Sequence, residues 1–331
     1  MLPVIFGLAG PEVSDAERGL FREIDPVGFI LFRRSITDPD QVRALTDSLR
    51  SLTGRDDTLI LVDQEGGRVQ RLQPPHWMAL PAQARIGGLA DAPARRAAWL
   101  LGRLIAHDVT GVGFNVACAP CLDLLQPETH QSIGDRAFAA DADRVAELGG
   151  QVIAGLKAGG ALPVIKHMPG HGRATSDSHF DLPVIDCDVD TLKHTDFRPF
   201  RRLARQSPLG MTGHLMYPAI DPDRPSTLSP AVIGEVIRMY CNFDGFLMSD
   251  DIDMKALDGT PAERALGALE AGCDAVLQCS GDFGTMQAVA NALPPISDQA
   301  QARLSLALAE LRRPEDFDPV AGLAELQDLV G

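Results

Sequence analysis

The chain has 331 residues and a formal net charge of −15 at pH 7, from 45 acidic and 30 basic side chains. Lys and Arg are not clustered or interleaved with aromatic residues, which argues against binding to nucleic acid or to an anionic membrane surface. No stretch approaches the roughly 20 apolar residues that span a bilayer, and the apolar N-terminus lacks the basic region of a signal peptide. We expect a cytoplasmic monomer that binds a small neutral or polar ligand.

Short apolar runs alternate with helix-like segments along the chain, which predicts parallel βα units. Most of these runs show no polar alternation, as expected for strands that are covered on both faces. The eight runs are residues 4–8, 28–32, 58–63, 114–119, 162–167, 209–214, 245–250 and 273–279. Eight strands with helices between them predict an α/β fold of the (β/α)8 TIM-like barrel type. An open doubly wound sheet is the alternative.

The intervening segments show the 3.6-residue period of amphipathic helices. Apolar stripes occur at Ala97, Leu100, Leu101, Leu104 and Ile105, at Val145, Leu148, Val152 and Leu156, and at Val232, Ile233, Val236, Ile237 and Tyr240. Ser229 followed by Pro230 predicts a helix start, and Thr260 to Glu263 has the spacing of a capping box. We expect a single domain over residues 1–331, with residues 314–331 as a helical C-terminal extension docked on the barrel.

The six cysteines show no framework of short spacings, so we expect reduced thiols. Cys118-Ala-Pro-Cys121 has the spacing of a redox motif. Because this motif closes an apolar strand, we interpret both thiols as buried and structural.

Polar residues follow five of the predicted strands, namely Asp63, Asp123, the pair Lys166-His167, His214 and Asp250. In a parallel barrel the carboxyl ends of the strands meet at one rim, so these side chains should converge on one site. Asp250 ends the run Gly-Phe-Leu-Met-Ser, where a carboxylate can attack the anomeric carbon of a sugar. Asp251 should point elsewhere, because consecutive strand residues face opposite sides, and we interpret it as a cap on the next turn.

The segment after the fifth strand reads Lys-His-Met-Pro-Gly-His-Gly-Arg-Ala-Thr-Ser-Asp-Ser-His over residues 166–179. Proline and glycine interrupt any regular ladder there, so Asp177 and His179 should lie in a loop. The carboxylate can hold one imidazole nitrogen and leave the other free to exchange a proton. This dyad suits general acid/base catalysis, and two loop residues that make local turn bonds are the alternative.

Two arginines could help to hold a sugar. Asp63 and Arg71 frame the sequence Asp-Gln-Glu-Gly-Gly-Arg-Val-Gln-Arg, and Arg136 lies in Gly-Asp-Arg-Ala-Phe after the fourth strand. Carboxylates accept hydrogen bonds from sugar hydroxyls, while arginine can donate two bonds to one oxygen-rich group. We also expect His214, at the end of the sixth strand, to contact the ligand.

The histidines could instead hold zinc. His167 with His171, and Asp177 with His179, have spacings that occur among zinc ligands. Pro169 and two glycines break the helical spacing that would align the first pair, and we expect no cysteine nearby. We therefore predict a site without a metal or other cofactor.

Four motifs in order resemble the bacterial β-N-acetylglucosaminidases of glycoside hydrolase family 3. They are Asp-Gln-Glu-Gly-Gly-Arg-Val-Gln-Arg at 63–71, Gly-Asp-Arg-Ala-Phe at 134–138, Lys-His-Met-Pro-Gly-His-Gly at 166–172 with Asp-Ser-His at 177–179, and Ser-Asp-Asp-Ile-Asp-Met at 249–254. The resemblance implies a retaining β-N-acetylhexosaminidase that releases N-acetylglucosamine from peptidoglycan-derived N-acetylglucosaminyl-(anhydro)muramyl peptides. It assigns the nucleophile to Asp250, the general acid/base to His179 and its partner to Asp177. The sugar-binding residues that it implies are Asp63, Arg71, Arg136, Lys166 and His167.

Other activities fit the same residues. In substrate-assisted hydrolysis the acetamido group attacks and the aspartate pair orients it. A β-N-acetylglucosaminide phosphorylase would use phosphate as acceptor, and a metal-dependent barrel hydrolase or a non-catalytic sugar-binding protein comes from another class. Many members of the family have a second α/β domain, for which this chain ends too soon, so the acid/base should come from the barrel's own loop.

Overall fold

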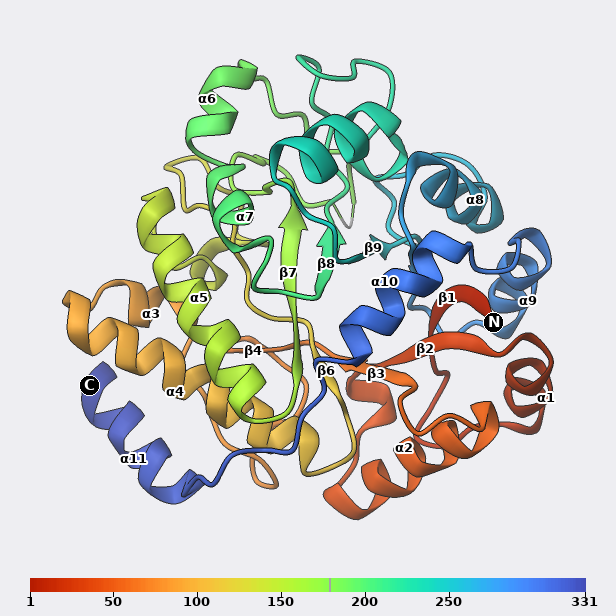
Figure 1. Ribbon diagram of the computed structural model, residues 1–331, viewed down its shortest axis with the longest axis horizontal. Coiled ribbons are helices and arrows are strands. Elements are labelled where there is room, and N and C mark those ends of the chain that lie inside the picture. The colour runs from red at the N-terminus through yellow and green to blue at the C-terminus, as the bar shows by residue number, and fades with distance from the viewer. Residues whose placement is uncertain (179) are drawn as a thin grey trace.

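A closed barrel of parallel strands forms the centre of the molecule (Figure 1). The structure is a computed structural model that describes residues 1–178 and 180–331. Within these residues eight strands follow one another around the barrel, and β10 pairs with β1 to close it. In this circular order they are β1 (Leu2–Gly7), β2 (Pro26–Leu31), β3 (Leu59–Val62), β6 (Val116–Ala117), β7 (Leu162–Met168), β8 (Leu209–Thr212), β9 (Phe246–Asp251) and β10 (Ala275–Gln278). The (β/α)8 prediction is therefore confirmed.

Helices cover the outside of the barrel. The α-helices are α1 (Asp15–Ile24), α2 (Pro39–Thr53), α3 (Gln83–Gly87), α4 (Asp91–Thr110), α5 (Ala142–Ala158), α6 (Val189–His194), α7 (Arg198–Leu203), α8 (Pro261–Ala271), α9 (Phe283–Ala292), α10 (Asp298–Leu308) and α11 (Pro319–Val330). Short 3-10 turns are η1 (Arg33–Ser35), η2 (Gly134–Arg136) and η3 (Ser226–Leu228), and η4 (Val232–Tyr240) is a π-helix. A small antiparallel hairpin, β4 (Gln64–Gly66) and β5 (Val69–Gln70), lies in the loop after β3.

Strand residues alternate between two apolar layers. In β1, Ile5 packs with Leu61 and Leu277 inside the barrel, whereas Val4 and Phe6 pack outward against the helices. Both layers are fully buried, which explains why the strands appear in the sequence as continuous apolar runs.

Both predicted helix starts are present, but one of the two helices is of a different type from the one expected. The capping box at the start of α8 is present, since the Thr260 side chain accepts from Glu263 N and the Glu263 side chain accepts from Thr260 N. Ser229 Oγ accepts from Val232 N at 3.1 Å and so caps the next helix as predicted. That helix, η4, is wound as a π-helix instead of the expected α-helix, and its last turn carries a Cys241 N to Val236 O bond of 2.8 Å.

The C-terminal segments cover two parts of the barrel. Helix α10 packs with the inner apolar layer through Ala300, Leu304 and Ala307, and it closes the end at which the strands begin. Helix α11 lies beside α4 (Figure 1), where Arg96 and Glu325 form two hydrogen bonds of 2.7 Å.

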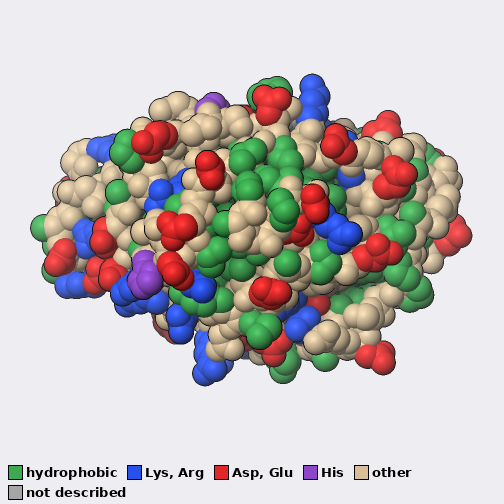
Figure 2. Space-filling view, turned by 90° about the horizontal axis from the view of Figure 1, so that it is seen from above, with side chains coloured by type: hydrophobic (Ala, Val, Ile, Leu, Met, Phe, Trp, Pro, Cys, Tyr) green, Lys and Arg blue, Asp and Glu red, His purple; other side chains and the backbone are tan. Residues whose placement is uncertain are grey.

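The outer surface mixes both signs of charge. On the face shown in Figure 2, acidic and basic side chains are interspersed around apolar ones. Among the described residues, no helix combines the length and the apolar character needed to cross a membrane.

Candidate active site

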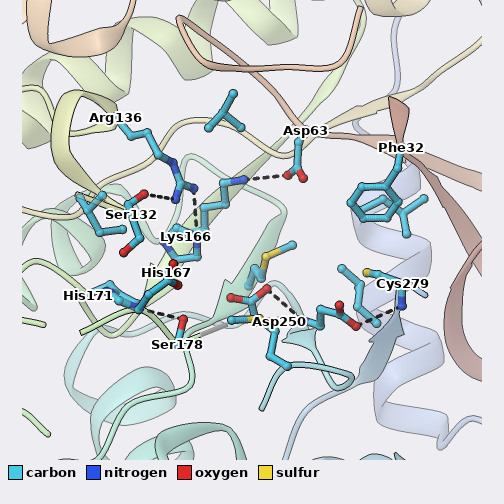
Figure 3. Close-up of a pocket in the computed structure, with 18 of the residues that line it drawn as sticks. Phe32, Asp63, Ser132, Arg136, Lys166, His167, His171, Ser178, Asp250 and Cys279 are labelled. Carbon is cyan, nitrogen blue, oxygen red and sulfur yellow. Dashed lines mark hydrogen bonds and ion pairs between the residues drawn. The ribbon is translucent and has the colours of Figure 1, made fainter. Parts of the chain in front are cut away.

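A cavity of about 320 Å³ opens at the carboxyl ends of the strands (Figure 3). Its size falls within the range of small-molecule sites. The charged and polar residues that line it are Asp63, Arg68, Arg71, Ser132, Arg136, Lys166, His167, His171, Asp177, Ser178, Asp250 and Asp251. Apolar and sulfur-containing residues complete the wall, namely Ile30, Phe32, Val69, Ile133, Met211, Met254, Leu277 and Cys279. The structure thus brings together nearly all of the described residues that the sequence assigned to a site.

Asp63 begins one wall of the cavity. It directly follows β3, and its Oδ1 accepts from Lys166 Nζ at 2.9 Å while its Oδ2 accepts from Arg71 Nη2 at 3.0 Å. Burial alone would raise the pKa of Asp63, but the charges of Lys166 and Arg71 lower that pKa well below its ordinary value. The wall therefore offers an ionised acceptor flanked by two cationic donors, which is the pattern that sugar hydroxyls need.

The β4–β5 hairpin places Arg71 and Glu65 on this wall. Its turn requires glycine, because Gly66 has φ of 91° and a Cβ there would lie 2.4 Å from Pro81 O. The Gln64 side chain fixes the end of the hairpin by accepting from Arg71 N at 2.9 Å.

Glu65 is the centre of this charged cluster, and it was not among the site residues predicted from the sequence. The buried Glu65 carboxylate accepts two bonds from Arg136, at 2.8 and 2.9 Å, and lies 2.7 Å from Lys166 Nζ. Burial acts to raise the pKa of Glu65, but Arg136 and Lys166 lower it to about 2. The sequence offered one indication of this role, the position of Glu65 within the 63–71 motif. A buried carboxylate that binds several cations has no characteristic spacing in a sequence.

His167 takes a defined orientation between two partners. Its Nδ1 lies 2.6 Å from Asp123 Oδ2, and its Nε2 lies 3.2 Å from Arg136 Nη2. Because a guanidinium can only donate, Nε2 accepts, and the ring hydrogen on Nδ1 points to Asp123. Asp123 also accepts from the backbone N of His171 at 2.6 Å. Asp123 is fully buried, so it acts by orienting His167 and the loop backbone.

Asp250 faces the cavity from the end of β9, on the side away from the Asp63 wall (Figure 3). Burial raises its pKa, but His214, His167 and the backbone N–H of Asp251 outweigh that effect, so the pKa of Asp250 lies below its ordinary value. The Asp251 N to Asp250 Oδ1 distance is 2.8 Å. An ionised carboxylate is thus held at one side of a cavity whose other side donates hydrogen bonds.

His214 does not line the cavity, which corrects the expectation that it contacts the ligand. Its Nε2 lies 2.9 Å from the backbone O of Asp251, and its Nδ1 lies 2.8 Å from Thr227 Oγ1. A carbonyl oxygen only accepts, so Nε2 donates and Nδ1 accepts from the Thr227 hydroxyl. Burial lowers the pKa of His214. His214 therefore holds the carbonyl group of Asp251, the residue after Asp250, from behind the cavity wall.

Asp251 caps the turn after β9, as the sequence predicted. Its Oδ1 accepts from Asp253 N and from Cys279 N, both at 3.1 Å. The residue also lines the cavity, which the alternation of strand side chains did not suggest. Burial and the charge of Asp253 raise the pKa of Asp251 to about 7, so the two adjacent carboxyl groups have pKa values shifted in opposite directions.

The loop after β7 contributes Asp177 and Ser178 to the cavity wall. Ser178 Oγ lies 3.3 Å from Nε2 of the buried His171, whose pKa is lowered to about 4 by burial. Gly172 packs against the preceding loop, where a Cβ would approach Leu124 O to 2.2 Å, so close contact explains this glycine. His179 lies outside the described residues, and its assignment as the acid/base remains a prediction.

A metal could bind only at the expense of existing hydrogen bonds. Cys121, Asp123 and His167 offer ligand atoms within 4.8 Å of one another, so the expectation that no cysteine lies near these histidines is wrong. Cys121 Sγ lies 3.2 Å from Asp123 Oδ2, the oxygen that also bonds His167 Nδ1. Burial raises the pKa of the Cys121 thiol well above its ordinary value, which opposes the thiolate that zinc binding requires. Cys118 is also buried, as predicted.

An ionised carboxylate at a strand end of this parallel barrel faces paired hydrogen-bond donors and acceptors. This arrangement is typical of a barrel enzyme that acts on a hydroxyl-rich ligand. Residues 10–308 match the model of the glycosyl hydrolase family 3 N-terminal domain. The chain belongs to glycoside hydrolase family 3.

Sequence and structural relatives agree with this assignment. A protein of Alkalilimnicola ehrlichii named β-hexosaminidase is 40% identical over 311 residues, covering 91% of this chain and 88% of the relative. A β-hexosaminidase of Methylobacillus flagellatus is 36% identical, covering 92% and 87% of the two chains. The structure of NagZ from Neisseria gonorrhoeae in complex with N-trifluoroacetyl-D-glucosamine is similar with a TM-score of 0.89 at 29% identity, covering 99% and 98%.

Proposed function

We propose that this chain is a retaining β-N-acetylhexosaminidase that releases terminal β-linked N-acetylglucosamine. The observation that carries the proposal is the placement of Asp250, whose carboxylate faces the same cavity as the Asp63 and Lys166 wall. A sugar bound to the Asp63 and Lys166 wall then directs its anomeric carbon toward Asp250, on the opposite side of the cavity. The names of the relatives support the choice of an N-acetylhexosamine.

In the first step of the proposed mechanism, an Asp250 oxygen attacks the anomeric carbon and displaces the leaving-group oxygen. His179, oriented by Asp177, protonates that oxygen, so the leaving group departs as a neutral alcohol. In the second step His179 removes a proton from water, which attacks the glycosyl-enzyme and regenerates Asp250 with net retention. The low pKa of Asp250 supports its role as the nucleophile, since the carboxylate must be ionised before it attacks.

Water is the acceptor that the cavity charges favour over phosphate. The cations of the described wall are already paired, with Lys166 and Arg71 on Asp63, Arg136 on Glu65, and Arg68 on Asp135 at 2.8 Å. A phosphate would have to compete with these carboxylates for its positive partners. Product analysis in phosphate buffer should therefore show free N-acetylglucosamine and no sugar 1-phosphate.

We further infer that the natural substrates are N-acetylglucosaminyl-(anhydro)muramyl peptides, and that the enzyme acts on them in the cytoplasm. We also infer that the active enzyme is a monomer. Size-exclusion chromatography of the active enzyme checks this inference, because a dimer that loses activity on dissociation would contradict it.

Replacing Asp250 with Ala tests the mechanism. We expect kcat on an aryl β-N-acetylglucosaminide to fall by about 10⁴-fold or more, because nucleophile loss leaves only binding and electrostatic contributions. Thermal unfolding should change little, since Asp250 lies at the cavity surface. Wild-type turnover by this variant would exclude the assignment. A 2-fluoro sugar should label Asp250 covalently, whereas substrate-assisted hydrolysis would leave the protein unlabelled.

A further inference from the structure

A second cavity lies at the opposite end of the barrel from the proposed active site. It has a volume of about 430 Å³ and opens between the end of α2, the end of α4 and the loop before β7, at the amino ends of the strands. Three basic side chains, Arg50, Arg103 and His107, line this cavity, and none of the described residues that line it is acidic. We call it the arginine pocket. It shares no described lining residue with the proposed active site.

Arg103 carries a charge that the fold leaves without an anionic partner. It is the most buried arginine of the described residues, at 4% exposed, yet no carboxylate lies within 4.0 Å of its nitrogens in the part of the chain that the structure describes. By contrast, the largely buried Arg136 and Arg238 pair with Glu65 and Asp274 at 2.8 and 2.7 Å. A buried cation without an anion is costly, so the surroundings of Arg103 favour a negatively charged ligand.

The fold holds two guanidinium groups in fixed orientations at this pocket. Arg103 Nη2 donates to Glu315 O at 2.7 Å, and the Arg103 guanidinium carbon lies 4.4 Å from the centre of the Phe317 ring. Arg50 Nη2 donates to Gly113 O at 2.6 Å. The Nη1 atoms of both arginines make no hydrogen bond with a described residue. Each guanidinium is therefore oriented by one edge and keeps N–H groups for a ligand.

Acidic groups around the pocket do not neutralise these two cations. Burial lowers the pKa of Arg50, and the charges of Asp47 and Asp56 do not offset this effect. Burial likewise lowers the pKa of Arg103 by more than the charge of Glu315 raises it. In a chain with a net charge of −15, a pocket lined by uncompensated cations favours an anion.

We propose that the arginine pocket binds a phosphate group, either as the free ion or as the monoester of a small metabolite. Phosphate oxygens can accept from two guanidinium groups at once, in a geometry that arginine matches. The exposed His107 at the mouth of the pocket adds a third nitrogen. The inference does not depend on the proposed function, because phosphate binding is measured in the absence of any glycoside.

The test measures binding by isothermal titration calorimetry on the full chain, with ionic strength held constant by sodium chloride. The probes are inorganic phosphate and glycerol 3-phosphate, and tighter binding of one of them assigns the free ion or the monoester. The variants are Arg50→Gln, Arg103→Gln and Arg103→Lys. Arg43→Gln is the matched control, because Arg43 also donates to a carbonyl near the pocket, Gly111 O at 3.3 Å, but pairs with Asp40 and does not line the pocket.

Wild-type protein should bind at least one probe saturably, with a Kd of about 1 mM or lower, as two charge-assisted hydrogen bonds allow. Arg50→Gln and Arg103→Gln should each raise this Kd by about 10-fold, and Arg103→Lys should fall between Arg103→Gln and wild type, because it keeps the charge and loses the fork. Arg43→Gln should stay within about 2-fold of wild type. Since the ligand binds only the folded chain, the same probe should raise the thermal unfolding midpoint of wild type and Arg43→Gln more than that of the other variants.

Two results would overturn the inference. The first is a wild-type protein that binds neither probe saturably, which would mean that Arg50 and Arg103 only hold backbone carbonyls. The second is saturable binding with the same Kd in wild type and Arg50→Gln, which would place the phosphate elsewhere, including the proposed active site. Arg50 is only partly buried, so Arg50→Gln decides the question even if Arg103→Gln fails to fold.

Discussion

Buried acidic side chains meet cations at both ends of the barrel, and the cluster at the carboxyl end lines the proposed active site. At the carboxyl end, Glu65 holds Lys166 and Arg136 against the cavity. At the amino end, Asp274 accepts from Arg238 at 2.7 Å and from Arg303 at 3.0 Å. The two clusters have similar burial and similar distances. A buried ion-pair cluster alone therefore does not identify an active site.

The Asp274 and Glu65 clusters differ in the other groups that their members contact. Asp274 also accepts from Leu247 N at 2.8 Å, and Arg238 donates to Phe243 O and Gly245 O at 3.1 and 2.7 Å. These bonds fix backbone at the beginning of β9. At the carboxyl end, by contrast, Lys166 and Arg136 are held by Glu65 and also line the cavity. There the ion pairs orient groups toward a ligand.

Replacing the central carboxylate at each end is expected to have the largest effect. Glu65→Gln and Asp274→Asn should each lower the free energy of unfolding by about 3–5 kcal/mol, because a buried cation loses its partner. Only Glu65→Gln should also lower kcat/KM of the folded enzyme, by about 100-fold, since Lys166 and Arg136 lose their orientation. Denaturant unfolding and kinetics at a temperature where both variants are folded measure the two quantities. An equal loss of activity in Asp274→Asn would contradict the comparison.

A third buried carboxylate, Asp108, has no cationic partner within 4.0 Å among residues 1–178 and 180–331. Asp108 on α4 is 6% exposed, and its Oδ2 has no hydrogen-bond partner. Burial raises the pKa of Asp108 to about 7. The folded-state pKa lies above the unfolded value of about 4, so folding becomes less favourable as pH rises between these two values. The loss is complete above pH 7.

Asp108→Asn should therefore stabilise the protein at pH 8, by at most about 4 kcal/mol relative to wild type. The advantage should shrink as the pH falls toward about 4, and it should vanish below that pH, where the carboxyl group is protonated in both states. Denaturant unfolding at pH 4, 6 and 8 measures this trend, and the exposed Asp47→Asn is the control. An advantage that does not change with pH would mean that burial of the charge is not the cause.

The smallest expected effect comes from a change in the hydrogen bonds that hold the backbone of Asp250 from behind. Thr227 Oγ1 lies 2.8 Å from both His214 Nδ1 and Thr212 Oγ1, and Asp250 N donates to Thr212 Oγ1 at 3.3 Å. Thr227→Val keeps the shape and removes the hydroxyl. We expect kcat to fall by about 3- to 10-fold, as for one lost hydrogen bond, with KM nearly unchanged. Thr227→Ser should restore kcat, and a loss in KM alone would contradict a positioning role.

Much of this site could be predicted because parallel strands end at a common rim. Asp63, Lys166, His167 and Asp250 each directly follow or end an apolar run, so the fold class alone placed them together. Glu65 could not be selected in this way, since it lies within a hairpin and faces Lys166 only after the barrel closes. Two further expectations were met only in part. His214 was expected to contact the ligand, and Asp251 was expected only to cap the next turn. In the folded chain His214 lies behind the cavity wall, where it binds the backbone O of Asp251, and the Asp251 side chain lines the cavity.

The amino-acid sequence by itself determined the eight strands, their helical covering and the loops that carry polar groups, because apolar periodicity and turn residues act over short distances. Only the tertiary structure decided which charges pair. The Glu65 cluster joins residues 65, 136 and 166, which lie far apart in the sequence. Such contacts depend on the closure and stagger of the barrel, which local sequence does not encode.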